Sequence, residues 1–316
     1  MTAQSRVNDI AQTTPLNGLC LINDWGVIQV AGADAASFLH GQMTQDFALL
    51  GMNEARLAAF CNAKGRMQAS FVGFKTSPDE VLLCCPTDVL PATLKRLSMF
   101  VLRAKAKLND VTASYRLYGA AGTAVLPSLG TQAWSKAQHE PATWVRLPSA
   151  EGVPRALVVQ PVDAPALQVT LGLDLWKWLE VRSGVCMVTQ PVFEAFVPQM
   201  LNYESVGGVN FKKGCYPGQE VVARSQFRGT LKRRAHVAAC DQAGASIAVG
   251  QELFHPSDAE QPCGLVTAVA PNPAGGLNAV VSVQNTAVDG LALHVGSPTG
   301  PALVLMPLPY ALLEDI

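Results

Sequence analysis

The sequence predicts an α+β protein whose chain ends in a small β-barrel. A chain of 316 residues exceeds the usual size of a single hydrophobic core, so we expect two or three domains. Short strand patterns alternate with helical patterns over the first two thirds of the chain, and the helical periodicity disappears after Arg234. Hydrophobic residues make up 49% and charged residues 15% of the chain, which is the balance of a folded globular protein.

The first third predicts one α+β unit of the βαβ type. Asp34 is a candidate N-cap for its first helix, and residues 62–65 are expected to form a turn between two strands. The expected helices are 34–42 and 91–100, and the expected strands are 26–30, 57–61, 67–74, 81–85 and 101–108.

The middle third repeats this pattern. Trp176 and Leu179 lie three residues apart in a helical pattern and are expected to pack in the core. We expect a strand that starts at 115–118, a hairpin of 144–147 with 155–160, and a helix at 173–183 closed by Gly184. Two such units in succession indicate an ancient duplication.

The last third predicts the barrel. Its short apolar segments are separated by Gly, Pro, Asn and Asp, a spacing that is typical of small β-barrels. The six expected strands are 235–240, 252–255, 264–270, 278–284, 292–295 and 301–306.

Composition limits the location and the cofactors. A formal net charge of -1 argues against a protein whose main role is nucleic-acid binding. No apolar run approaches the roughly 20 residues that span a bilayer, so we expect a soluble, cytoplasmic protein without a membrane partner. The 8 cysteines include no C-x-x-C pair and no Cys/His set at metal-ligand spacing, so we expect no metal site.

The segment 211–234, called the basic segment below, carries the strongest functional signal. It holds seven of the chain's 23 Lys and Arg residues and only one acid, Glu220. Such a local excess of positive charge indicates a site for an anionic ligand. The seven are Lys212, Lys213, Arg224, Arg228, Lys232, Arg233 and Arg234.

Cys215 lies in this basic segment and is a candidate catalytic nucleophile. Pro217 and Gly218 predict a turn directly after it, and a helix from Gln219 would turn its partly positive N-terminus toward the thiol. The helix end and the two preceding lysines would favour the thiolate. The alternative is that this thiol packs as a small hydrophobic side chain, as most cysteines do.

A second group of basic residues lies between positions 95 and 107, where the chain has no acid. The group is either a solvated strand edge or an extension of the basic segment toward a polyanion such as tRNA. Charge alone does not separate the two. Its members are Lys95, Arg96, Arg103, Lys105 and Lys107.

The string KKGCYPGQEVVAR, residues 212–224, closely resembles the signature of the folate-binding YgfZ family, bacterial relatives of the aminomethyltransferase of the glycine cleavage system. The resemblance continues in FLHGQMTQD at 38–46, CNAKGR at 61–66 and GGVNF at 207–211. The signature residues that support Cys215 are Lys212, Lys213, Gly214, Tyr216, Gly218, Gln219 and Glu220.

The resemblance implies a fold and a division into domains. It implies two ferredoxin-like α+β domains and the barrel, packed as a ring around a central folate pocket. We expect the first domain at 1–112, the second at 113–230 with the signature at its end, and the barrel at 231–316.

The resemblance also implies tetrahydrofolate, or another reduced folate, as the cofactor. Its anionic glutamyl tail would pair with arginine side chains, while polar groups would face its pterin ring. The candidate tail contacts are Arg66, Arg224 and Arg228, and the candidate pterin contacts are Asp46 and Asn62.

Two functions remain open. The first is a folate-binding accessory protein for the assembly or repair of iron-sulfur clusters in selected enzymes, including tRNA-modifying ones, with Cys215 as its reactive group and only an indirect link to tRNA. Its partners would be iron-sulfur enzymes or assembly factors. The alternative is a folate-dependent one-carbon transferase that acts on a protein or tRNA substrate.

The aminomethyl transfer of glycine cleavage is not expected. Aminomethyltransferases resemble this chain near Asn62, but they carry two aspartates where it has Ala69 and Ser70. Their pterin-binding glutamate falls on Arg182. Without those carboxylates the chain lacks the acid-base group of that reaction, which typically contributes roughly 10²- to 10⁴-fold in rate.

Overall fold

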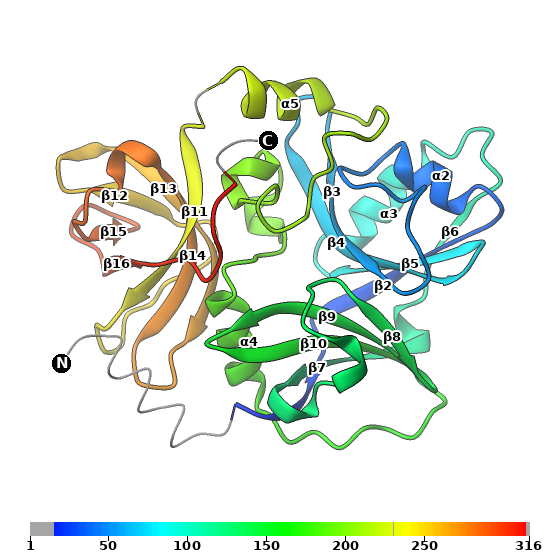
Figure 1. Cartoon of the computed structure of the whole chain (residues 1–316). Coiled ribbons are helices and arrows are strands. Elements are labelled where there is room, and N and C mark those ends of the chain that lie inside the picture. Colours follow the sequence, from blue (N-terminus) through cyan, green and yellow to red (C-terminus); the bar gives the residue numbers. More distant parts are fainter. Residues whose placement is uncertain (1–15, 230, 314–316) are drawn as a thin grey trace.

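The computed structural model describes residues 16–229 and 231–313. Two β-sheets and a closed barrel lie around the middle of the molecule, and the segment between helix α4 (Leu173–Arg182) and the barrel runs through that middle (Figure 1). This mixed architecture with a C-terminal barrel confirms the predicted fold class. Within the described residues, no helix combines the length and the hydropathy needed to cross a bilayer.

The first sheet is antiparallel, with the strand order β3-β4-β5-β2-β6. Phe38, Leu39 and Leu97 of its two helices pack on Ile28 and Phe71 of the sheet, because alternate strand residues point to that face. The elements are β2 (Trp25–Ala31), α2 (Ala35–His40), β3 (Ala55–Cys61), β4 (Met67–Ser77), β5 (Glu80–Pro86), α3 (Leu90–Ser98) and β6 (Lys107–Asp110).

The predicted strand at 101–108 is wrong for residues 101–106. Asp34 takes both backbone polar groups of Lys105: its Oδ2 accepts the Lys105 N–H at 2.7 Å, and its own N–H donates to the Lys105 carbonyl at 3.1 Å. Pairing with β2 therefore starts only at Lys107. The same contact leaves Asp34 without a side-chain cap bond, and α2 is shorter than predicted.

The basic residues between 95 and 107 are all exposed. Lys95 and Arg96 lie on α3, within the predicted helix, whereas only Lys107 of the other three lies on a strand, β6. Their relation to a polyanionic partner stays a prediction.

The second sheet has the order β1-β7-β10-β9-β8. Its first strand comes from the start of the described chain and pairs antiparallel with β7, from Gly18 opposite Ala121 to Ile22 opposite Leu117. The chain thus contributes to the second sheet before it forms the first, while the domain limits near 112 and 230 stay a prediction. The strands are β1 (Gly18–Ile22), β7 (Tyr115–Ala121), β8 (Lys136–His139), β9 (Ala142–Ala150) and β10 (Val153–Pro161).

Helix α4 (Leu173–Arg182) joins the second sheet to the barrel. The Trp176 ring fills the space beside Gly119 of β7, where a Cβ atom would lie 2.3 Å from the ring. Trp178 Nε1 donates to Asn278 Oδ1 of the barrel at 2.7 Å. Val27 of the first sheet and Val280 of the barrel belong to the same buried cluster as Trp176, so one core connects all three parts.

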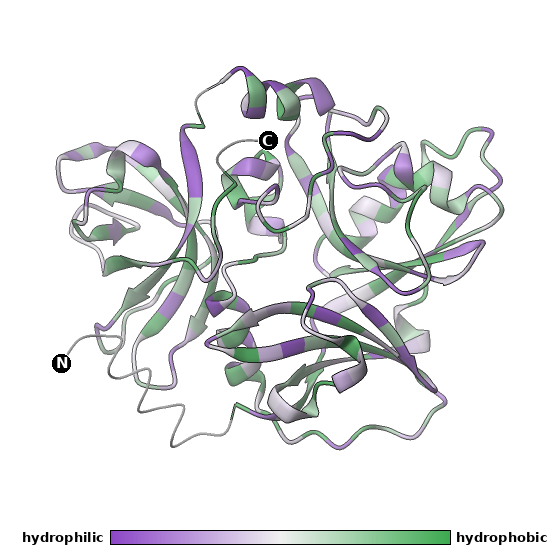
Figure 2. Cartoon of the chain, viewed as in Figure 1, coloured by the Kyte–Doolittle hydropathy of each residue, from purple (hydrophilic) through white to green (hydrophobic). Residues whose placement is uncertain are grey.

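The barrel is closed, with the order β11-β14-β13-β12-β15-β16, and β11 also pairs with β16. All six predicted strands are confirmed. The first strand is hydrophilic where it begins, at Arg233 and Arg234, and more hydrophobic beyond (Figure 2). The strands are β11 (Arg233–Cys240), β12 (Glu252–His255), β13 (Asp258–Pro271), β14 (Leu277–Gln284), β15 (Leu293–Val295) and β16 (Ala302–Met306).

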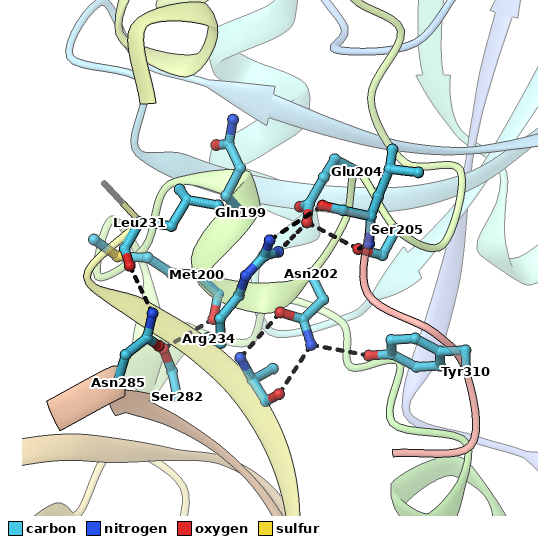
Figure 3. A network of polar contacts seen from close by, with 12 residues as sticks. Gln199, Met200, Asn202, Glu204, Ser205, Leu231, Arg234, Ser282, Asn285 and Tyr310 are labelled. Carbon is cyan, nitrogen blue, oxygen red and sulfur yellow. Dashed lines mark hydrogen bonds and ion pairs between the residues drawn. The ribbon is translucent and has the colours of Figure 1, made fainter. Parts of the chain in front are cut away.

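A polar network attaches the barrel to the central segment (Figure 3). Arg234 forms a buried ion pair with Glu204, whose side chain is fully enclosed. Asn202 Nδ2 donates to the Ala235 carbonyl at 2.9 Å and to the Tyr310 hydroxyl at 3.2 Å. Because a buried ion pair tolerates little change in geometry, this network fixes where the basic segment enters the barrel.

Candidate functional site

The signature forms a tight turn followed by a helix, as the sequence predicts. Gln219 N–H donates to the Tyr216 carbonyl at 3.2 Å, and Gly218 adopts φ 81° and ψ 1°. With Pro217 at the preceding position, these are the dihedrals of a type II turn, which favours glycine at its third position. Helix α5 (Gln219–Phe227) starts directly after it.

The turn at 62–65 packs against this signature turn. A Cβ atom on Gly218 would lie 2.5 Å from the Asn62 carbonyl oxygen and 2.6 Å from Gly65 Cα. A Cβ atom on Gly65 would lie 3.0 Å from Val221 Cβ of α5. Two motifs separated by about 150 residues in the chain are therefore in direct backbone contact, and a side chain at Gly218 would separate them.

Asn62 and Arg66 hold the 62–65 turn in place. Asn62 Oδ1 accepts the backbone N–H of Lys64 at 2.9 Å and that of Arg66 at 3.0 Å. Arg66 Nη1 donates to the Ala195 carbonyl at 2.6 Å. Both predicted folate contacts thus have structural partners in this state of the protein.

Arg224 and Arg228 lie one helical turn apart and line a hollow of about 470 Å³ beside α5. Both guanidinium groups are exposed, and Phe227 and Glu220 line the same hollow. Arg66 does not line it, so the three predicted tail contacts do not form one cluster.

Lys213 connects the signature to the C-terminal end of α2 by hydrogen bonds. Its Nζ donates to the carbonyls of His40 at 2.5 Å and Met43 at 2.9 Å, just after the helix C-terminus, and lies 4.6 Å from the Tyr216 ring centroid. Cations are favourable near a helix C-terminus. Burial lowers the pKa of Lys213 to about 8, although Asp46 and Cys215 raise it in part.

The string at 38–46 supports the site from the other side. Thr44 Oγ1 donates to the Gly208 carbonyl at 2.7 Å, and Gln45 Nε2 donates to the Gly207 carbonyl at 2.8 Å. Asp46, a predicted pterin contact, faces His40 with its Oδ1 3.0 Å from His40 Nδ1. The strings at 38–46, 61–66 and 207–211 therefore all meet around the signature.

Cys215 is exposed, whereas the other cysteines are buried. Burial raises the pKa of Cys61 to about 12 and that of Cys186 to about 11, so those thiols are inert at neutral pH. Lys212 is exposed, and its backbone N–H donates to Asn210 Oδ1 at 2.8 Å. Exposure alone thus distinguishes Cys215 from every other thiol of the chain.

Comparison with known proteins assigns the family. The tRNA-modifying protein YgfZ of Klebsiella pneumoniae (strain 342) is 30% identical over 322 residues, which cover 94% of each chain. The chain belongs to the YgfZ family. The YgfZ protein of Sodalis glossinidius (strain morsitans) is 29% identical over 314 residues, again covering 94% of each chain. No protein-family model matches the chain.

The fold agrees with the family's relation to aminomethyltransferases. Glycine cleavage system aminomethyltransferase T from Bartonella henselae superposes with a TM-score of 0.66 at 18% identity, over 98% of this chain and 90% of that one. At this identity the likeness shows a common fold. At the two positions compared with the aminomethyltransferase aspartates, this chain has Ala69, which is buried, and Ser70, whose hydroxyl accepts the Val188 N–H at 2.8 Å.

Sequence reasoning missed two parts of this YgfZ structure. The first is His40 of the 38–46 string, for which the sequence signal is its position six residues before Asp46. The second part is a hollow of about 580 Å³ lined by residues 51–56 and 132–135 together with Gln45 and Gly207. Arg56 pairs with Glu54 there at 2.7 Å, and the Trp134 indole N–H donates to the Val206 carbonyl at 2.9 Å.

Proposed function

We propose that this protein is a folate-binding accessory protein for iron-sulfur enzymes, including enzymes that modify tRNA. The observation that carries the proposal is the exposed Cys215, presented on a signature turn that is supported by three other family strings. Curated relatives along nearly the whole chain are named as tRNA-modifying proteins, which supports the link to tRNA. The aminomethyltransferase fold supports a folate site.

The residues of the signature helix fit a reduced folate in part. Arg224 and Arg228 offer two exposed guanidinium groups to the anionic glutamyl tail, and Phe227 offers an aromatic surface beside them. Asp46 and Asn62 face the pterin in this proposal. Since their bonded oxygens already serve His40 and the 62–65 turn, they would act through their remaining polar atoms.

The accessory role is supported by the exposure of the Cys215 thiol. Among the described residues there is no group of three or more His, Cys, Asp or Glu side chains able to hold a metal ion. Cys215 is open to another protein, so the proposal places the cluster in the partner enzyme and the contact at the exposed thiol.

Tetrahydrofolate titration tests the cofactor part of this proposal. In a calorimetric titration of the reduced protein at pH 7.5, tetrahydrofolate is expected to bind saturably at one site per chain. No detectable binding at millimolar folate would exclude the proposed function.

The second candidate function is a one-carbon transferase, and the glycine-cleavage version of it is testable. With Ala69 and Ser70 in place of the acids, we expect little methylene-tetrahydrofolate or ammonia to form from an aminomethylated lipoyl carrier protein. Loss of a positioned acid-base group predicts at least a roughly hundred-fold deficit. Turnover within about ten-fold of an authentic aminomethyltransferase would show that this chain performs that reaction.

A further inference from the structure

His40 and Asp46 form a hydrogen-bonded pair next to the signature turn. His40 ends α2, and its Nδ1 lies 3.0 Å from Asp46 Oδ1. Asp46 also accepts the Leu49 N–H at 2.9 Å. Burial raises the pKa of Asp46, but the hydrogen bonds from Leu49 and His40 outweigh it and the pKa is lowered.

The ionised Asp46 decides the tautomer of His40. A carboxylate only accepts hydrogen bonds, so Nδ1 of the imidazole must carry the proton that lies between them. In the neutral imidazole the other nitrogen, Nε2, then holds a free lone pair. A nitrogen in this state can accept a proton.

Nε2 faces the chain next to Cys215. A Cβ atom on Gly214 would lie 3.2 Å from Nε2, and no heavy atom outside residues 213–215 is as near to that position. Because Gly214 has no side chain, the His40 imidazole can lie close to the turn. Cys215 is the next residue of the chain, and proton transfer to Nε2 requires its thiol to reach this nitrogen by a change of χ1 rotamer or through one bridging water.

We infer that His40, oriented by Asp46, is the proton acceptor for the Cys215 thiol. The inference rests on the proposed role of Cys215 as the reactive group. The S–H bond breaks, its proton forms an N–H bond at Nε2, and the thiolate keeps the electron pair. With an alkyl iodide, that pair then forms the S–C bond as iodide leaves, and solvent removes the proton from the imidazolium.

Two charged groups, Asp46 and Lys213, act on the positive charge that His40 acquires when it accepts the proton. Asp46 stabilises the imidazolium that forms, as an orienting carboxylate does beside a catalytic histidine. Lys213, whose Nζ is bonded to the His40 carbonyl, opposes that charge but stabilises the thiolate.

The pH profile of Cys215 alkylation tests the inference. Iodoacetamide labelling of Cys215 is followed by peptide mapping from pH 5 to 9 in the parent chain, in His40→Gln and in Asp46→Asn. We expect His40→Gln to slow labelling at pH 7 by at least about ten-fold and to move the profile to higher pH. Asp46→Asn should shift the profile in the same direction.

His139→Gln is the matched control, because His139 is exposed on β8 and should leave the profile unchanged. Thermal unfolding and circular dichroism of each variant separate a local effect from loss of the fold. An unchanged profile in folded His40→Gln, with Cys215 still the labelled residue, would overturn the inference and leave the proposed function standing. Failure of the parent to label at Cys215 would instead overturn the proposed function.

Discussion

At the scale of single residues, Gly218 is where the signature and the 62–65 turn touch. Its φ of 81° is in the left-handed region, and its α-hydrogen faces the backbone of Asn62 and Gly65. Pro217-Gly218 predicted the turn because that dipeptide specifies local dihedrals. No local signal predicted the contact with residues 62–65, since it depends on two distant segments meeting.

Gly218→Ala should destabilise the protein more than Gly152→Ala does. Both glycines have positive φ values, 81° and 72°, so both alanines carry a conformational cost of about 1 kcal/mol. Only Gly218 adds a steric conflict, which typically costs roughly 1–3 kcal/mol more, because nothing lies within 4 Å of a Cβ at Gly152. Urea unfolding measures both variants, and equal losses would contradict the packing described for the signature.

For Lys213, the sequence predicted the charge near Cys215 but not the contacts of the side chain. The sequence places a lysine two residues before Cys215, which predicts a favourable charge for the thiolate. The structure shows the ammonium group bonded to the carbonyls of His40 and Met43, about 170 residues away in the chain. The direction of a long side chain depends on tertiary contacts, so sequence spacing did not contain this anchoring role.

At the scale of elements, α5 was predictable and the 101–106 loop was not. The start of α5 depends on a local turn and on helical residues after it. The conformation of residues 101–106 depends on tertiary contacts such as that of Lys105 with Asp34, which lies about 70 residues earlier in the chain. Alternating side chains gave these residues a strand pattern, but a strand also needs a partner for its backbone, and the backbone groups of Lys105 bond to Asp34 instead.

Arg224→Ala and Arg228→Ala should weaken tetrahydrofolate binding. Each variant removes a charged partner of the glutamyl tail from the hollow beside α5, which typically costs about 1.5–3 kcal/mol, or roughly ten-fold to more than hundred-fold in affinity. Calorimetric titration gives the change. Arg103→Ala is the control, because Arg103 is exposed outside this hollow. If both helix variants bind as the parent does, these arginines do not hold the tail.

At the scale of the whole molecule, the alternation of strands and helices and the barrel followed from hydrophobic period and turn residues. The placement of β1 in the second sheet did not, because any strand can pair with several others and the choice is made by the complete core.

The hydrophobic core keeps the buried thiols protonated. Burial raises the pKa of Cys61 to about 12, and it raises that of Cys84 further.

The buried thiols predict a loss of stability at alkaline pH. Their folded pKa values lie above the unfolded value near 9, so their contribution is complete below about pH 8.5 and is lost as pH rises toward the folded values. At pH 10 each such thiol costs about 1.4 kcal/mol. The lowered pKa values of Lys213 and Lys136 work in the opposite direction, but two amines offset only part of the sum.

Urea unfolding at pH 7.5 and pH 10 under reducing conditions checks this sign. The parent should lose several kcal/mol between the two pH values, and Cys186→Ala should reduce that loss by about 1.4 kcal/mol. Equal stability of the parent at both pH values would contradict the burial of these thiols.

The most direct test of the central claim, that folate binds beside a reactive Cys215, is the labelling of all 8 cysteines by limiting iodoacetamide with and without tetrahydrofolate. The folded protein at mildly acidic pH should be alkylated first at Cys215. Rising tetrahydrofolate should change that rate saturably, with the midpoint equal to the calorimetric dissociation constant. Preferential labelling of another cysteine, or a Cys215 rate that saturating folate leaves unaltered, would contradict the claim.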